Sequence, residues 1–351
     1  MRARSFGTDA AFAADLASCG VALRGGSKTF FAASLILPGS VRGPATALYA
    51  FCRATDDEID LSPEPARALD RVRERLRRVY EGVSFGDPVD RCFAETVDRF
   101  AIPRALPEAL IEGFEWDSAK RRYADFEGVR AYGARVAGTV GAMMAILMGA
   151  RGLETYARAC ELGLAMQFTN IARDVGEDAR MGRLYLPLDR MRAAGLDPDE
   201  FLANPRFDDR VAHVVREVLD TADELYARGM AGIVALPAGC RPAIRAAASL
   251  YGEIGREVAR RGFDSVSARA VVAPSRKVSV LLGAALSASV DRKFVEAPPL
   301  PAIARLAEAA ASSRRAIPRP PPAWWRLQAR AERMVELCEV LAKREQVGAG
   351  R

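Results

Sequence analysis

The chain has 351 residues, of which half are apolar and 27% are charged, so it can bury a large core and is neither disordered nor collagen-like. Its 51 basic and 45 acidic residues give a formal net charge of +6, which favours an anionic ligand or surface. Scattered basic residues and only 7% aromatics argue against a nucleic-acid partner. A single histidine, His213, excludes a multi-histidine metal site, so any metal should be a hard ion held by carboxylates, with magnesium first.

Cysteine use and hydropathy predict a cytoplasmic protein. The six cysteines are far apart, with no CxxC pair, as expected for reduced thiols, most of them buried. Asp9 and Asp15 interrupt the N-terminus, which lacks the apolar run of a signal peptide. The longest uncharged stretch, Val136–Ala150, has 15 residues and falls short of the roughly 20 that span a bilayer. We therefore interpret it as a buried core helix.

The predicted elements are helices throughout. One amphipathic helix follows Asp60, with Ser62 as its cap and Pro63 in its first turn. Another covers residues 211–226, and alanine-rich segments fill much of the remaining chain. Clusters of glycine and proline separate the periodic segments, at residues 38–44, 82–88, 103–107, 198–205 and 237–242. The pattern predicts an all-α domain of ten or more helices over residues 1–312.

Two further segments have alternative interpretations. Residues 313–351 are predicted to form a linker rich in proline and arginine, followed by an amphipathic helix. That helix should pack on the main domain, and lying on a membrane surface is the alternative. The arginine-rich helix face at residues 71–78 is interpreted as a solvated surface, with attraction to anionic lipid as the alternative.

The first candidate site is an acidic run on a helix. Asp56 and Asp60 are four residues apart, so they lie on one helical face, one turn apart. Two carboxylates in this arrangement repel each other unless a cation lies between them. Arg53 lies one turn earlier on the same face. A solvated acidic patch is the simpler explanation of this run taken alone.

A second polar stripe makes a metal site the better explanation. Gln167, Asn170, Asp174 and Asp178 are spaced by three, four and four residues within a strongly apolar segment, so they share one helical face. A polar stripe on a buried helix is costly unless it faces a cavity with partners. The alternative is a helix that emerges at the surface near Arg173.

Two aspartate pairs on two helices can hold magnesium ions against a diphosphate. Neutralising the pyrophosphate promotes its departure and leaves a carbocation, and apolar walls hold a long hydrocarbon and exclude water. Met143, Met144 and Met148 are candidate walls of such a chain pocket. This chemistry requires no histidine, no thiol and no covalent nucleophile.

Four ordered motifs resemble the phytoene/squalene synthase family over about residues 27–280. They are SKTFFAAS at Ser27–Ser34, YAFCRATDDEID at Tyr49–Asp60, Tyr132 with VAGTVG at Val136–Gly141, and Gln167–Asp178 followed by RLYLP at Arg183–Pro187. Within the family, the run Phe114–Asp117 is most similar to bacterial members that make phytoene. Gly133 stands where cysteine is frequent, and Ser267 and Ala268 stand where an arginine-rich stretch is common.

The resemblance implies an all-α isoprenoid-synthase helical bundle around a central cavity. It implies that two or three magnesium ions, or manganese in their place, bind to a set of oxygen ligands: Asp56, Asp60, Asn170, Asp174 and Asp178. Tyr132 would line the reaction chamber and join the aspartates as a catalytic residue. The implied substrate contacts are Ser27, Lys28, Phe30, Arg53, Gln167, Asn170, Arg173, Tyr251 and Arg269.

The implied reaction joins two geranylgeranyl diphosphates head to head, through prephytoene diphosphate, to phytoene. Squalene, dehydrosqualene and presqualene diphosphate synthases are the alternatives within the family, and no NADPH is expected. A non-catalytic helical protein of the same fold is the rival from another class, and the two intact aspartate pairs speak against it. Peripheral contact with the inner membrane face, and handover of the product to a phytoene desaturase, are further expectations.

Overall fold

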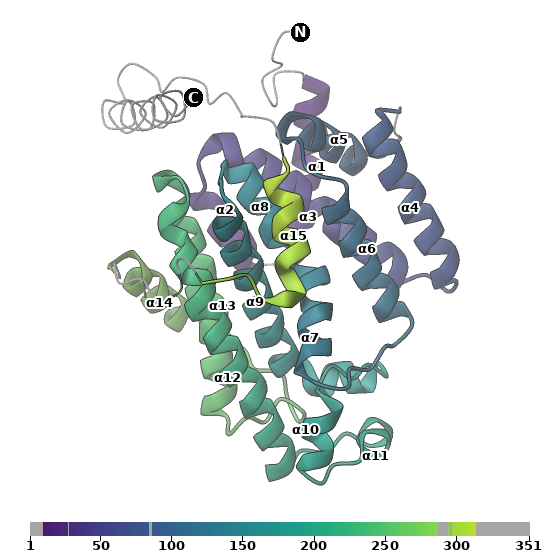
Figure 1. The fold of residues 1–351 in the computed structure, drawn as a ribbon, viewed down its shortest axis with the longest axis vertical. Coiled ribbons are helices and arrows are strands. Elements are labelled where there is room, and N and C mark those ends of the chain that lie inside the picture. Colours follow the sequence, from purple (N-terminus) through teal and green to yellow (C-terminus); the bar gives the residue numbers. More distant parts are fainter. Residues whose placement is uncertain (1–9, 27, 84–85, 287–293, 295–296, 314–351) are drawn as a thin grey trace, which may run out of the picture. The chain divides into compact units, whose positions relative to one another are not determined.

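The computed structural model describes residues 10–26, 28–83, 86–286, 294 and 297–313, all within a compact unit that spans residues 1–314 (Figure 1). The described residues form helices and connecting segments without any β-strand, so the predicted all-α class is confirmed. Ser27 and the predicted linker and helix beyond residue 313 lie outside the described residues. The predicted boundary at residue 312 stays a prediction.

The first half of the chain contains eight α-helices and one π-helical turn. Their bounds are α1 (Ala10–Gly26), α2 (Lys28–Ile36), α3 (Gly39–Asp60), α4 (Pro65–Glu81), α5 (Pro88–Phe100), α6 (Ala105–Ser118), α7 (Phe126–Gly133), the π-helical turn η1 (Ala134–Gly138) and α8 (Thr139–Met148).

The second half begins with the longest helix and ends with a short one. Its elements are α9 (Leu153–Arg180), α10 (Leu188–Ala193), α11 (Pro198–Ala203), α12 (Asp209–Ala231), the 3₁₀ turns η2 (Gly232–Ala235) and η3 (Ala238–Cys240), α13 (Arg241–Arg260), α14 (Pro274–Leu286) and α15 (Pro301–Ala311).

Helix α9 is the centre of the bundle. It packs against α8, α12, α13 and α15, and Figure 1 shows these helices around it. Apolar side chains such as Leu164, Phe168 and Ile171 are buried along it, as expected for a helix enclosed on most sides. The polar stripe that ends at Asp178 is therefore held within the core of the protein rather than on an outer face.

Helices α8 and α9 approach each other more closely than side chains would allow. A Cβ atom added to Gly141 would lie 2.2 Å from the carbonyl oxygen of Ala159, and one added to Gly163 would lie 2.3 Å from that of Ala137. Only glycine permits such backbone contact. The VAGTVG motif, which begins in the π-helical turn, thus includes a packing position that sets the distance between these two helices.

Several predicted boundaries were wrong. Helix α4 begins at Pro65, and Ser62 accepts a hydrogen bond from the backbone of Glu64 in the preceding turn instead of capping the helix. Pro44 lies inside α3 rather than in a connection. A proline at the sixth helical position loses the backbone hydrogen bond to residue i−4 and crowds the carbonyl of that residue, which here is Ser40.

The remaining expectations about composition agree with the structure. The five described cysteines are free thiols, and four of them are buried. His213 is more than half exposed and lies 3.4 Å from Glu217, away from the aspartates. The continuous helical run Phe126–Met148 has the length and hydropathy of a membrane span, but 61% of its most apolar window is buried inside the protein, as in a core helix.

Candidate active site

The C-terminal ends of α3 and α9 carry the two aspartate pairs, and the structure brings these ends together. Arg183, which follows α9, donates to both carboxylate oxygens of Asp60 at 2.6 and 3.1 Å. Asp117 at the end of α6 lies within electrostatic range of Asp56, Asp60 and Asp178. The two stripes predicted from spacing therefore face one common acidic region.

The acidic region holds more negative charge than its surroundings neutralise. Burial, reinforced by the neighbouring Asp60, raises the pKa of Asp56 to about 7. Burial also raises the pKa of Asp178 to about 7, with the charge of Asp174 adding to the effect. For Asp117, burial raises the pKa to about 6, although two tyrosine hydroxyls and Arg183 oppose the rise. Carboxylates held in this way are prepared to bind cations.

Four arginines surround the aspartates. Arg173 forms a two-pronged pair with Asp174 at 2.5 and 2.7 Å, and Arg269 reaches the same carboxylate at 2.8 Å from the segment after α13. Arg53 pairs with Asp57 at 2.7 Å. Guanidinium groups match the geometry of phosphate oxygens, so the mouth of the site presents both signs of charge that a metal–diphosphate complex requires.

Three residues that the sequence analysis did not assign form a hydrogen-bonded cluster with Tyr132 and Asp60. The hydroxyl groups of Tyr132 and Tyr185 donate to the two carboxylate oxygens of Asp117 at 2.8 and 2.6 Å, and Arg183 connects the cluster to Asp60. In the sequence, these residues lie in the run that ends at Asp117 and in the RLYLP motif, and the spacing of these motifs indicated no role for them.

Tyr132 lies beside the reaction chamber rather than on its apolar wall. It is 3% exposed, stacks on Tyr185 with ring centroids 5.0 Å apart and is not among the residues that line the cavity. The contribution of Tyr132 to the reaction chamber stays a prediction. The π-helical turn that follows Tyr132 directs Val136 and Ala137 to the cavity instead.

A long apolar cavity extends inward from the acidic region. Among the described residues, no charged side chain lines it, and its polar groups include Gln167 and Asn170 near the aspartates. Met144 and Met148 line it as predicted, whereas Met143 is buried elsewhere. Among the described residues, the walls come from nine helical elements and two connections, with Phe30, Ala33, Leu37, Ala45, Leu48, Tyr49, Val140, Ala159, Leu162, Gly163, Met166, Leu236, Ala243, Ile244, Ala247 and Tyr251 among them.

Helical geometry gives the length of this cavity. Along α9 the lining runs from Asn170 to Thr155, which spans about 22 Å at 1.5 Å per residue. Along α13 it runs from Tyr251 to Ala243, on one face of the helix. Asn170 and Tyr251 both lie at the end near the arginines and aspartates, since Tyr251 acts electrostatically on Arg173. A chain of several isoprene units fits along this axis.

Aromatic rings gather where the apolar cavity meets the charged mouth. The ring of Phe30 lies 5.2 Å from that of Tyr251 and 6.2 Å from that of Tyr49. Phe30 and Tyr251 thus line the same cavity as Gln167 and Asn170, and their contact with substrate stays a prediction. Ser27 and the side chain of Lys28 lie outside the described part of the chain.

The oxygen ligands at the mouth fit a hard divalent cation. The amide oxygen of Asn170 is buried without a hydrogen-bond partner, and it lies one turn before Asp174 on the same face. Within the described residues, no three acidic, histidine or cysteine side chains are close enough to enclose a metal ion. Magnesium is typically held by one or two carboxylates together with substrate phosphates, so two separate aspartate pairs suit it.

Known proteins are similar to this chain in sequence. The chain is 48% identical to the phytoene synthase of Cereibacter sphaeroides, with 86% of this chain and 89% of that protein covered. It is 47% identical to the phytoene synthase of Rhodobacter capsulatus, with 85% and 90% covered.

Solved structures agree with the sequence matches. A dehydrosqualene synthase crystallised with a ligand superposes with a TM-score of 0.73 at 30% identity, covering 78% of this chain and 96% of the other. A squalene synthase from Alicyclobacillus acidocaldarius gives a TM-score of 0.68 at 25% identity, covering 74% and 99%. The profile described as squalene/phytoene synthase matches residues 23–278, and the chain belongs to the squalene/phytoene synthase family.

Proposed function

We propose that this enzyme condenses two molecules of geranylgeranyl diphosphate, through prephytoene diphosphate, to phytoene, the first committed step of carotenoid biosynthesis. The observation that carries the proposal is the meeting of two aspartate pairs, on α3 and α9, at one end of a long apolar cavity. The phytoene synthases that are 47% and 48% identical over most of the chain support the choice of substrate and product.

Magnesium is the ion that the donor set favours. Asp56 and Asp60 on one side, and Asn170, Asp174 and Asp178 on the other, would hold two or three ions, with manganese as the alternative. The ions, when bound, neutralise the pyrophosphate leaving group. The arginines act with them, because a cation that binds Asp174 or Asp60 releases guanidinium groups for the diphosphate oxygens.

The cavity wall controls the fate of the carbocation. Its apolar side chains exclude water, which would otherwise quench the cation as an alcohol. The faces of Phe30, Tyr49 and Tyr251 stand at the charged end of the cavity, where aromatic rings stabilise positive charge by roughly 1–2 kcal/mol each.

The hydrogen-bonded cluster around Asp117 fixes the side chains next to the aspartate pairs. The hydroxyl of Tyr132 donates a hydrogen bond to Oδ2 of Asp117, and the hydroxyl of Tyr185 donates one to Oδ1. This arrangement keeps both rings in place beneath the aspartate pairs and keeps Arg183 directed at Asp60. Asp117 is thus a positioning residue for the metal–diphosphate region.

The assay that tests the proposal uses purified protein, magnesium and geranylgeranyl diphosphate alone. Phytoene should form without NADPH, and an Asp56→Asn variant should lose turnover while Asp70→Asn, on the exposed face of α4, keeps it. A hydrocarbon formed only from farnesyl diphosphate would instead support squalene or dehydrosqualene synthesis. No product from either substrate in any metal would contradict the proposal.

We further propose that the enzyme works in the cytoplasm at the inner face of the membrane and passes phytoene to a desaturase. A C40 hydrocarbon is insoluble in water, so release into lipid removes the barrier to its departure. Vesicle flotation tests this location, because protein that stays wholly in the soluble fraction would contradict it.

A further inference from the structure

Three arginines converge on one buried carboxylate outside the active site. Glu253 on α13 is 1% exposed and accepts from the Nε atoms of Arg276 and Arg256 at 2.7 and 2.8 Å. Arg260 donates to the same carboxylate at 2.8 Å. Glu257, one turn away, also pairs with Arg260 and Arg261. Positive charge therefore exceeds negative charge around Glu253.

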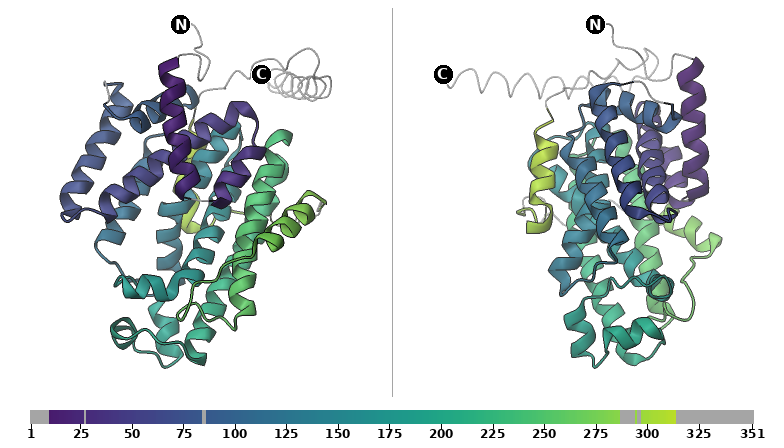
Figure 2. Two further views of the ribbon diagram at one scale, coloured as in Figure 1. Left: turned by 180° about the vertical axis from the view of Figure 1, so that it is seen from behind. Right: turned by 90° about the vertical axis from the view of Figure 1, so that its right-hand side faces the viewer.

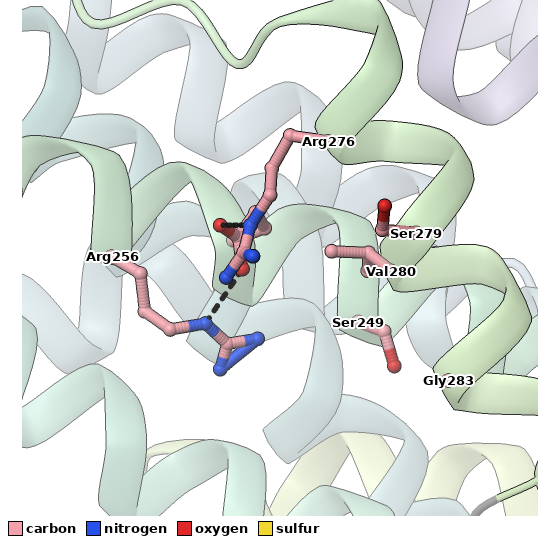
Figure 3. Close-up of a pocket in the computed structure, with 7 residues that line it drawn as sticks. Ser249, Arg256, Arg276, Ser279, Val280 and Gly283 are labelled. Carbon is pink, nitrogen blue, oxygen red and sulfur yellow. Dashed lines mark hydrogen bonds and ion pairs between the residues drawn. The ribbon is translucent and has the colours of Figure 1, made fainter.

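A pocket between α13 and α14 is lined by two of these arginines and carries the excess positive charge. It encloses about 300 Å³ and is lined by Ser249, Glu253, Arg256, Arg276, Ser279, Val280 and Gly283. Arg256 and Arg276 each give only the Nε atom to Glu253, so their terminal nitrogens have no partner among the described residues. Figure 3 shows the guanidinium groups of Arg256 and Arg276 near each other, whereas the hydroxyl of Ser249 points away from them. These donors suit the oxygens of a phosphate group.

Exposed apolar side chains lie on α14 outside the pocket, and on neighbouring segments. Val278 and Leu282, one turn apart on α14, are 58% and 64% exposed, and Val271 before the helix is 65% exposed. Leu35 and Ile36 are exposed on α2, which packs against α13. In the right-hand view of Figure 2, α1 and α14 lie along the same side of the protein. Exposed valine and leucine next to arginines whose terminal nitrogens stay available are typical of a membrane-surface helix.

The basic face of α4 lacks this excess of positive charge. Arg71 and Arg75 pair with Glu58, and Arg75 also pairs with Asp90. Arg77 pairs with Glu74 and Glu81 on its own helix. These partners neutralise α4, so its arginine-rich sequence, which had suggested lipid attraction, provides little surplus charge. The sequence alone did not distinguish the two surfaces, because the neutralising partners of α4 come partly from other helices.

We propose that α14 and the Glu253 pocket form the membrane-docking surface, with the pocket holding the phosphate of an anionic phospholipid and Val278 and Leu282 inserted among the acyl chains. The inference rests on the proposed function, because it concerns release of the hydrocarbon product. Helix α13 lies between this surface and the cavity. Tyr251 faces the cavity and Glu253, 200° further around the helix, faces the pocket. Docking here places the cavity wall formed by α2 and α13 against the lipid that receives the product.

Sedimentation with vesicles tests the proposal on the full-length protein. Binding to phosphatidylcholine vesicles that contain phosphatidylglycerol should exceed binding to pure phosphatidylcholine and should decrease with salt. Arg256→Gln with Arg276→Gln should lower the affinity about 30-fold, given the attraction of two basic residues to an anionic surface. Val278→Ser with Leu282→Ser should lower it at least about 10-fold and leaves the ion pairs of Glu253 intact, so folding is preserved.

The matched control removes the same number of arginines from α4, and one exposed valine just after that helix. Arg67→Gln, Arg77→Gln and Val83→Ser together should leave vesicle binding unchanged. Undiminished binding by the α14 variants, or equal loss in the α4 control, would overturn the proposal. So would calorimetric binding of inorganic phosphate that depends on Arg256 and Arg276 without vesicle binding, or capture of an acidic peptide instead of lipid.

An activity assay in detergent separates this inference from the proposed function. The α14 variants should keep wild-type turnover of detergent-dispersed geranylgeranyl diphosphate, because their changed residues lie away from the aspartates and the cavity. Turnover in detergent without any vesicle binding would overturn the docking surface and leave the function standing. Vesicle binding that requires α14, in a protein without synthase activity, would contradict the function and leave the surface standing.

Discussion

Replacing Asp178 by asparagine should stabilise the metal-free protein at pH 8 while it abolishes turnover. Burial and the charge of Asp174 raise the pKa of Asp178 from 3.8 to about 7, a difference that corresponds to about 4 kcal/mol at 1.36 kcal/mol per pKa unit. The side chain is half-buried, and solvent screening reduces the effect to about 1–2 kcal/mol.

The sign of the pH dependence follows from proton binding. Between about pH 4 and pH 7 the folded protein binds more protons at Asp178 than the unfolded chain, so the free energy of unfolding falls as pH rises through this range and then levels off. The advantage of Asp178→Asn should thus be small at pH 5 and full at pH 8. Urea denaturation in a chelator measures it, with the exposed Asp70→Asn as control. A variant no more stable than wild type at pH 8 would refute the reasoning.

Three further predictions concern the cavity, the packing and the docking surface. Ala247→Phe should shorten the cavity next to Tyr251 and shift the preferred substrate from the C20 to the C15 diphosphate, which product analysis with both substrates measures; unchanged preference would refute it. Gly163→Val should lower the free energy of unfolding by about 3 kcal/mol, because its Cβ would lie 2.3 Å from the oxygen of Ala137. Thermal unfolding against Gly20→Val, a helical position with no atom within 4 Å of the added Cβ, tests whether the contact or any lost glycine matters. Three arginines lower the pKa of Glu253 to about 2, so its contribution of about 2 kcal/mol is present above pH 4.5 and is lost as pH falls toward 2; Glu253→Gln should remove that pH dependence in acid denaturation curves.

The sequence predicted the fold class and the acidic stripes because both depend on local spacing. Residues four positions apart share one face of any α-helix, whatever surrounds that helix. This holds for Asp56 with Asp60 and for Asp174 with Asp178. The helical periodicity likewise identified a buried α9. These predictions required no knowledge of which helices meet.

What the sequence could not supply depends on contacts between distant elements. Asp117 lies between the aspartate pairs only because the end of α6 meets the ends of α3 and α9, and the pairing of Arg183 with Asp60 joins residues 123 positions apart. The hydrogen bond from Tyr132 on α7 to Asp117 on α6 likewise joins two separate elements. Helix boundaries near Ser62 and Pro44 were missed because capping and proline signals are weak beside tertiary packing.

The most direct test of the central claim is a crystal structure with manganese and a non-hydrolysable thio analogue of geranylgeranyl diphosphate, in which anomalous scattering locates the ions. The account predicts manganese between the diphosphate and the carboxylates of Asp56, Asp60, Asp174 and Asp178, with the prenyl chain along α9 toward Thr155. Asp60 and Asp174 still held by Arg183 and Arg269, with no ion at either pair and the diphosphate elsewhere, would contradict it.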